Sequence, residues 1–223
     1  MIWPTICIDN FFDNPEKVVE IANSFPYKKD ETGKWPGKRC EHVGNLHYEL
    51  FLYSSKKIVA SMFPNEYKNL QWNCSQFFQK IKPEDHRGPG WVHKDDQAEF
   101  TCIIYLSKNP NNGTSLFSNN NFFNYKMDKN TTVKWKYIKE NKTSSSKIYQ
   151  NALKDNNSNF TKTCSFNSIY NRMILFDSNQ SHGVDSFDNN DNEERLTLIS
   201  FFYDLSKTDG SLLKKHGTEH KRI

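Results

Sequence analysis

Apolar and polar residues alternate in short runs through the second half of the chain. The run 71–81 alternates between two faces, and 100–106 is almost continuously apolar, which is typical of a strand buried on both sides. Similar runs occupy 114–117, 171–176 and 195–203, each next to turn-forming residues. Short strands separated by turns favour a β-sandwich or barrel over a parallel sheet.

The first third of the chain has a different pattern. Residues 5–8 predict a short strand, and 13–16 combine a capping side chain, a proline and an early acid, which predicts a helix start. A second helix is predicted from 47 to 63. Residues 27–46 are charged and interrupted by glycine and proline, so we expect a loop there. Residues 1–70 should therefore form a helical layer that supports the β core.

The length of 223 residues fits a single domain that is large enough to bury a core. We expect its β core to consist of residues 71–118 and 165–205. Residues 119–164 are predicted to be an insertion between these two parts. The basic residues 206–223 are predicted to form a frayed tail.

The predicted insertion, residues 119–164, is rich in asparagine, lysine and serine. It contains possible helices at 133–138 and 148–153 but shows no obvious hydrophobic face. One interpretation is a mobile surface segment. The other is a substrate lid, because long insertions in compact domains are often functional.

The composition limits the environment of the protein. Hydrophobic residues make up 35% of the chain and the net charge is +4, which permits an acidic partner but does not argue for nucleic acid. The sequence shows no signal peptide and no apolar run of membrane-spanning length. The five cysteines are scattered and include no CxxC pair, which favours reduced thiols. We therefore expect a cytoplasmic protein with no membrane partner.

A histidine and an aspartate lie two residues apart, directly after a glycine-containing loop. On an extended strand, the side chains of His93 and Asp95 leave the same face. His182 follows a hydrophobic strand and is expected to approach them from across the sheet. Two imidazoles and one carboxylate form the facial triad of non-haem Fe(II) oxygenases, which leaves positions open for a 2-oxo acid and O2. The alternative is that His93 and Asp95 only hydrogen-bond each other at a strand start.

An arginine opens the last hydrophobic strand. Burying Arg195 is unfavourable unless a carboxylate meets it, and its planar fork suits bidentate capture of the far carboxylate of 2-oxoglutarate. Thr197 shares its face of the strand and is predicted to donate a further hydrogen bond to that carboxylate. Alternatively, Arg195 reaches solvent or pairs with Glu193 or Glu194.

The segments next to these residues resemble the prolyl-4-hydroxylase-like branch of the Fe(II)/2-oxoglutarate oxygenases. In that branch a Tyr-Leu strand follows the HxD motif, and a glycine-containing turn leads to the next strand; 101–108 and 113–117 match this pattern. The resemblance covers 90–117 and 170–203. It implies a mainly β protein with flanking helices and a double-stranded β-helix core of the jelly-roll or cupin type.

The resemblance also implies individual roles. Fe(II) would be bound by His93, Asp95 and His182, and Arg195 would bind the distal carboxylate of 2-oxoglutarate. Tyr105 would donate its hydroxyl to the same carboxylate, unless it is an ordinary core aromatic. With O2, this set would hydroxylate an unactivated C–H bond, and a peptidyl side chain such as proline is the substrate that the branch implies.

Three other functions remain open. A small-molecule or nucleobase oxygenase would use the same core. A non-catalytic jelly-roll binding module would have lost a metal ligand or the arginine, and all four residues are present. A cupin-type metalloenzyme that does not use 2-oxoglutarate would lack the arginine.

Overall fold

The structure is a computed structural model that describes most of the chain. The described residues are 3–30, 35–83, 85–86, 88–95, 97–108, 113–120, 147–187 and 194–207.

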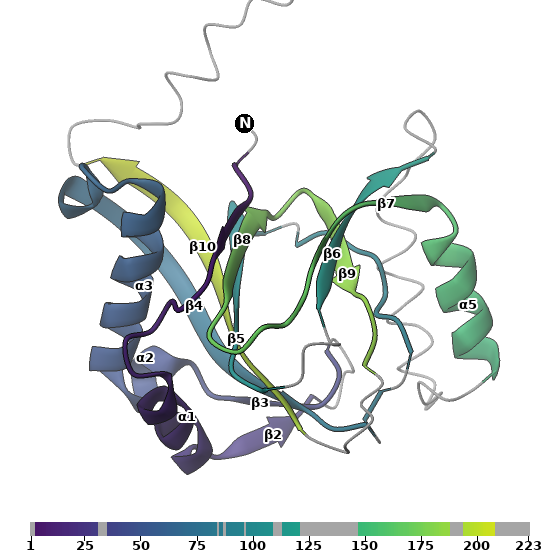
Figure 1. Ribbon diagram of the computed structural model, residues 1–223, viewed down its shortest axis with the longest axis horizontal. Coiled ribbons are helices and arrows are strands. Elements are labelled where there is room, and N and C mark those ends of the chain that lie inside the picture. Colours follow the sequence, from purple (N-terminus) through teal and green to yellow (C-terminus); the bar gives the residue numbers. More distant parts are fainter. Residues whose placement is uncertain are drawn as a thin grey trace, which may run out of the picture.

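A large antiparallel sheet forms the centre of the molecule (Figure 1). Its seven strands lie in the order β1 (Ile6–Ile8), β8 (Met173–Asp177), β5 (Phe100–Tyr105), β10 (Arg195–Lys207), β4 (Leu70–Ile81), β3 (Lys38–Cys40) and β2 (Tyr27–Lys29). Strands that are distant in sequence are neighbours, since β10 lies between β5 and β4. The strands expected from the alternating pattern are confirmed.

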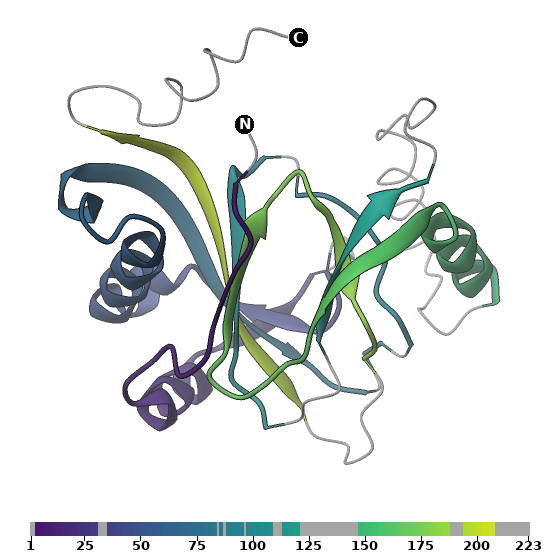
Figure 2. The same cartoon turned by 45° about the horizontal axis from the view of Figure 1, so that its top comes forward.

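A smaller sheet faces the inner strands of the large one. It contains β7 (Phe160–Phe166), β6 (Thr114–Asn119) and β9 (Ser181–Val184), again all antiparallel. A single backbone pair between His93 and His182 extends its β9 edge. Figure 2 shows the two sheets on opposite sides of the barrel interior. The segment that carries His93 therefore forms one isolated bridge with β9 and is not the strand that its sequence suggested.

The helices of the first third cover the outer face of the large sheet (Figures 1 and 2). They are α1 (Pro15–Ser24), α2 (Val43–Leu46), α3 (Tyr48–Met62) and the short 3-10 helix η1 (Tyr67–Asn69). The predicted start of α1 is confirmed, because the Asn14 side chain accepts a hydrogen bond from Lys17 N at 3.0 Å.

The loop predicted at residues 27–46 is wrong. This segment contains β2, β3 and α2. Both strands have only three residues. Their sequences are Tyr-Lys-Lys in β2 and Lys-Arg-Cys in β3, so they show no hydrophobic alternation. Pairing of β3 with the edge of β4 makes them part of the sheet, and that contact is not visible in local sequence.

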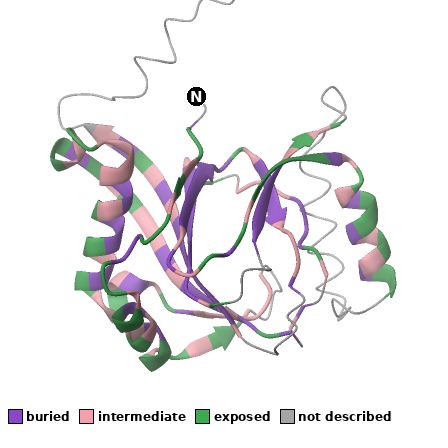
Figure 3. Cartoon of the chain, viewed as in Figure 1, coloured by how far each residue is buried: buried purple, intermediate pink, exposed green. Residues whose placement is uncertain are grey.

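Two hydrophobic cores follow from the alternation of side chains across the large sheet. The outer core packs strand residues such as Phe78, Leu198 and Phe202 against the helices. The inner core lies between the two sheets and contains Ile103, Tyr105, Leu116, Ile174 and Phe176. Figure 3 shows that the buried residues gather in the central strands, while the helices are exposed on their outer sides.

The predicted insertion is partly β structure. The helix expected near 148–153 is confirmed as α5 (Lys147–Asn157), but it does have a hydrophobic face, because Tyr149 and Leu153 are buried against Trp91. β7 follows and pairs with β6, so the described part of 119–164 reaches into the barrel. The helix expected at 133–138 and the tail from 208 onward lie outside the described residues. Among the described helices, each is too short or too polar to cross a membrane.

Candidate active site

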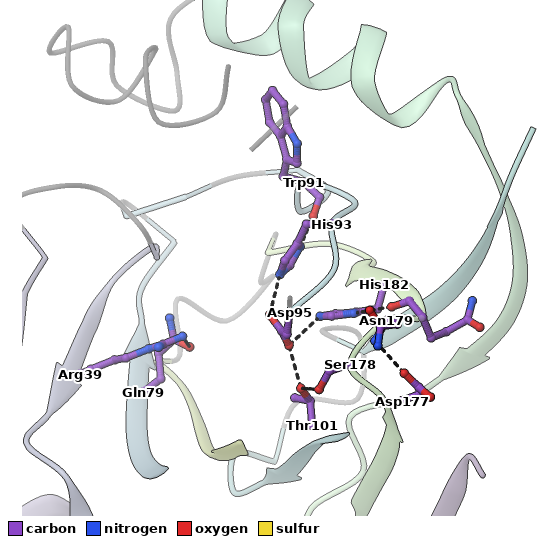
Figure 4. Close-up of polar contacts among 11 residues, drawn as sticks. Arg39, Gln79, Trp91, His93, Asp95, Thr101, Asp177, Ser178, Asn179 and His182 are labelled. Carbon is purple, nitrogen blue, oxygen red and sulfur yellow. Dashed lines mark hydrogen bonds and ion pairs between the residues drawn. The ribbon is translucent and has the colours of Figure 1, made fainter. Parts of the chain in front are cut away.

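The structure brings His93, Asp95 and His182 together at one end of the barrel interior. One ligand atom from each side chain lies within 4.8 Å of the other two. His93 Nε2 is 3.6 Å from Asp95 Oδ1, and His182 Nε2 is 3.3 Å from Asp95 Oδ2. Figure 4 shows the two imidazoles on either side of the carboxylate. The Nε2 atoms of the two histidines and the carboxylate of Asp95 therefore converge on one point, as the sequence predicted for a metal triad.

Each imidazole is oriented by a backbone carbonyl. His93 Nδ1 lies 2.7 Å from Trp91 O, and His182 Nδ1 lies 2.9 Å from Gln180 O. A carbonyl only accepts, so Nδ1 carries a proton in both rings, and Nε2 is the nitrogen that faces Asp95. Both rings are thus oriented with Nε2 toward the carboxylate.

Asp95 is held as an anion. Burial by itself raises its pKa, but positive charge on the two imidazoles and hydrogen bonds from His182 and Thr101 outweigh this and hold the pKa of Asp95 well below its usual range. Thr101 Oγ1 lies 2.8 Å from Asp95 Oδ2 and 2.9 Å from Ser178 Oγ. The carboxylate is therefore charged at neutral pH and fixed in orientation.

Two asparagines of α5 hold the segment that carries His93. Asn157 Oδ1 accepts from Val92 N at 3.0 Å, and Asn157 Nδ2 donates to Gly90 O at 2.9 Å. Asn156 Nδ2 donates to Val92 O at 3.0 Å. The side-chain amides thus satisfy backbone groups along one edge of the segment.

The other edge of this segment pairs with β9. His93 N donates to His182 O at 2.9 Å, His182 N donates to His93 O at 2.8 Å, and Gly90 N donates to Val184 O at 2.8 Å. Trp91 anchors the segment further, because its ring packs on Tyr149 of α5 with 6.0 Å between centroids. The segment that carries His93 is therefore positioned by β9 on one side and α5 on the other.

A second group of polar residues lies farther along the barrel interior. Arg195 and Thr197 are buried in β10, and Thr197 is paired in register with Tyr105 of β5. The Arg195 guanidinium carbon lies 5.7 Å from the centroid of the Tyr105 ring. Burial lowers the pKa of Arg195, and Tyr105 opposes that shift. The three residues predicted to bind the co-substrate are thus neighbours on one inner face.

The hydrogen bonds of this group differ from the expectation in one respect. Tyr105 donates its hydroxyl to Thr114 Oγ1 at 2.8 Å, and burial raises the pKa of Tyr105 to about 12. A phenol has one proton, so Tyr105 cannot also donate to a carboxylate unless it turns away from Thr114. Thr114 keeps its own proton and is a further donor that the sequence reasoning missed.

A comparison with family models decides the family. The model of DUF6445, a family of unknown function, matches residues 3–202. The chain belongs to this family. No curated protein matches this DUF6445 chain.

Solved structures show which fold the DUF6445 chain has. It is similar to HygX from Streptomyces hygroscopicus with nickel and 2-oxoglutarate bound, with a TM-score of 0.56 and 8% identity over 89% of this chain and 82% of that chain. It is also similar to a 2OG-Fe(II) oxygenase family oxidoreductase from Burkholderia pseudomallei, with a TM-score of 0.51 and 11% identity over 89% and 83%.

A third similar structure is the non-heme alpha ketoglutarate dependent epimerase SnoN from nogalamycin biosynthesis, with a TM-score of 0.53 and 10% identity over 91% and 79%. These likenesses show that the DUF6445 chain has the fold of the Fe(II)/2-oxoglutarate oxygenases. The predicted double-stranded β-helix is therefore confirmed.

The sequence reasoning missed the residues that support His93, Asp95 and His182. Thr101 shares strand parity with Tyr105, so its inward position was open to prediction. Asn156 and Asn157 carried no such signal, since both lie in an asparagine-rich segment far from the HxD motif. Only the docking of α5 shows their role.

Proposed function

We propose that this protein is an Fe(II)- and 2-oxoglutarate-dependent oxygenase that hydroxylates an unactivated C–H bond. The convergence of His93, Asp95 and His182 within 4.8 Å carries this proposal. Two neutral imidazoles and one carboxylate match the donor set of non-haem Fe(II) sites, and three ligands leave positions for a chelating co-substrate and O2. The orientation of both imidazoles by backbone carbonyls supports a site prepared for metal.

The inner face of β10 fits the far carboxylate of 2-oxoglutarate. Thr197 Oγ1 is buried and has no hydrogen-bond partner among the described residues. A buried hydroxyl without a partner is unfavourable, so an absent acceptor is expected beside it. Arg195 supplies positive charge two positions along the same face. We infer that Arg195, Thr197 and either Tyr105 or Thr114 bind this carboxylate.

The residues of the chain would bind and orient the reactants. Fe(II) with 2-oxoglutarate and O2 supplies the oxidising power for C–H hydroxylation, with succinate and CO2 as the other products. Asp95 and the two histidines would hold the metal, and the hydrogen bond from Thr101 keeps one carboxylate oxygen engaged. The inner core excludes water from the co-substrate side, which strengthens the contacts of Arg195.

The substrate is open between two classes. The resemblance in sequence implies a peptidyl side chain such as proline. HygX has been solved with hygromycin B bound, and SnoN acts in nogalamycin biosynthesis, so small organic molecules are the substrates suggested by these relatives. A cytoplasmic location is part of the proposal, and it is supported by five free cysteines that form no disulfide.

Anaerobic titration of the purified apoprotein tests the proposal. Fe(II) and then 2-oxoglutarate are added, and the weak visible charge-transfer band of the chelate is followed. We expect the band in the wild type, its loss in His93→Ala, and a 2-oxoglutarate affinity lower by about 10- to 100-fold in Arg195→Gln, because hydrogen bonds to charged groups are strong.

Arg172→Gln is the matched control, because Arg172 pairs with Asp9 at the surface. It should leave the band unchanged. Metal binding without a 2-oxoglutarate band would contradict the proposal and point to another metalloenzyme. Absence of metal binding would leave a jelly-roll binding module.

A further inference from the structure

A row of polar side chains crosses the inner face of the large sheet and leads from the inner core toward β3. Arg39 of β3 is paired in register with Gln79 of β4, Gln79 with Thr197, and Thr197 with Tyr105. Residues paired in register on antiparallel strands point to the same face. Arg39 therefore faces the barrel interior, on the same face as the residues assigned to 2-oxoglutarate.

Two buried donors in this region lack an acceptor. Arg39 Nε and Trp35 Nε1 are both buried, and neither has a hydrogen-bond partner among the described residues. The two groups are adjacent, because the Arg39 guanidinium carbon lies 4.4 Å from the Trp35 ring centroid. Buried N–H groups are nearly always satisfied, so an acceptor is missing from this place.

Gln79 of β4 holds the loop that carries Trp35. Gln79 Nε2 donates to Pro36 O at 2.7 Å, and Gln79 Oε1 accepts from Arg39 Nη2 at 3.3 Å. Gly37 has a φ of 70°, and a Cβ there would lie 2.2 Å from Lys80 O. One glutamine thus fixes both the loop carrying Trp35 and the arginine, so both donors are preorganised.

The site lies on the metal side of the barrel. Figure 4 shows the Arg39 side chain extending from its strand toward the side where Asp95 lies. Burial lowers the pKa of Arg39 to about 10, and the Asp95 carboxylate is the largest of the nearby charges that oppose this shift. Arg39 is therefore charged at neutral pH and lies on the same side of the sheet as the triad.

The chemistry of these groups selects an anion. All the unsatisfied atoms are donors, and one of them belongs to a cation. Trp35 covers a face of the guanidinium and Gln79 accepts one proton of Nη2, so the unsatisfied Nε proton, with the second proton of Nη2 beside it, is what remains for a ligand. A guanidinium edge suits a planar carboxylate, with two parallel N–H···O contacts.

We propose that Arg39, Trp35 and Gln79 form an anchor for a carboxylate of the prime substrate and direct the rest of that molecule to the metal. The substrate is then a carboxylate-bearing organic molecule. This inference rests on the proposed function, since it assigns the substrate class of the same site. It separates Arg39, which binds the substrate, from Arg195, which binds 2-oxoglutarate.

The test uses the protein loaded with Mn(II) and N-oxalylglycine, which keeps the site catalytically silent. Acetate, benzoate and 3-phenylpropanoate are titrated, each against its primary amide. Binding is read by calorimetry and by the paramagnetic broadening of ligand proton resonances, which reports proximity to the metal. We expect the carboxylates to bind about tenfold or more tightly than the amides, because hydrogen bonds to a charged group are strong.

Three variants test which residues cause the preference for carboxylates over amides. Arg39→Gln should abolish it, and Trp35→Phe, which keeps an aromatic ring and removes the N–H, should reduce it several-fold. Lys38→Gln removes the same charge from the neighbouring residue of β3, which points to the opposite face, and should leave it unchanged. Circular dichroism and thermal unfolding verify that each variant is folded.

The failures are distinguishable. Equal binding of carboxylates and amides would overturn the inference while leaving the proposed function intact. A loss of N-oxalylglycine affinity in Arg39→Gln as large as that in Arg195→Gln would also overturn it, because Arg39 would then bind the co-substrate. A wild type that binds no metal would contradict the proposed function. Calorimetry with the carboxylates would still decide whether Arg39 binds an anion.

Discussion

Removal of the Asn157 amide should weaken metal binding although this residue touches no metal ligand side chain. Asn157 satisfies one backbone N–H and one backbone C=O of the segment just before His93, at 3.0 Å and 2.9 Å. Asn157→Ala removes both contacts and frees one edge of that segment. The other edge stays paired with β9.

The size of the effect follows from these two bonds. A buried polar group that loses its partner costs about 1–3 kcal/mol, and the lower end applies here because Asn157 is half-buried and water can reach part of the gap. We therefore expect a loss of about 2–3 kcal/mol in the free energy of unfolding. Partners that orient metal ligands typically contribute about 10- to 100-fold to metal affinity. The variant should show a loss in this range.

Two measurements separate these effects. Urea unfolding of the apoprotein gives the change in stability, and calorimetric titration with Mn(II) under conditions where the variant is folded gives the change in metal affinity. Asn151→Ala is the matched control, because Asn151 lies on the same helix with an exposed side chain. It should leave both quantities nearly unchanged.

The reasoning would be refuted by a variant that loses stability but keeps the wild-type affinity for Mn(II). Asn157 would then support the fold in general and not the position of His93. An unchanged stability would show that water replaces the amide at both backbone groups.

Three further predictions concern other parts of the barrel. Thr197→Val removes a buried hydroxyl that has no hydrogen-bond partner in the described part of the chain, so thermal unfolding should show an apoprotein at least as stable as the wild type, while charge-transfer titration should show 2-oxoglutarate affinity lower by about tenfold. Equal affinity would contradict the assignment of this hydroxyl. Asp185 accepts hydrogen bonds from β6 and β7, and although burial raises its pKa, these contacts lower it overall. A lowered folded-state pKa gives stability that is present above about pH 4 and lost as the pH falls through the folded value, so the stability gap between wild type and Asp185→Asn should shrink on acidification. A gap that is constant with pH would refute this. Gly37→Ala should destabilise the protein more than Gly88→Ala in urea unfolding, because both have a positive φ but only a Cβ at Gly37 meets Lys80 O, at 2.2 Å. Equal losses would show that the backbone shifts freely there.

Local sequence determined most of the core strands and three of the helices, α1, α3 and α5. The alternation over 71–81 and the apolar run at 100–106 are properties of each segment alone. They therefore predict β4 and β5 without knowledge of the partner strands. The same holds for the start of α1, where Asn14 caps a backbone amide three residues later. The grouping of His93, Asp95 and His182 was predictable because a site able to hold a metal needs these particular residue types.

Tertiary structure decided the short elements and the groups that support the site. β2 and β3 have three residues each and exist because the edge of β4 offers backbone partners, a contact that leaves no pattern in sequence. Asn157 acts on His93 across 64 residues of chain (157 − 93), through a helix whose hydrophobic face was not apparent from its composition.

The anchor at Arg39 shows the same limit. The proposed role of Arg39 depends on its pairing in register with Gln79. Gln79 pairs in turn with Thr197, and Thr197 pairs with Tyr105. Residue types alone determined what chemistry this protein is able to hold at its centre. Which residues surround that chemistry was decided by strand order and register, because these bring together side chains that no local interaction connects.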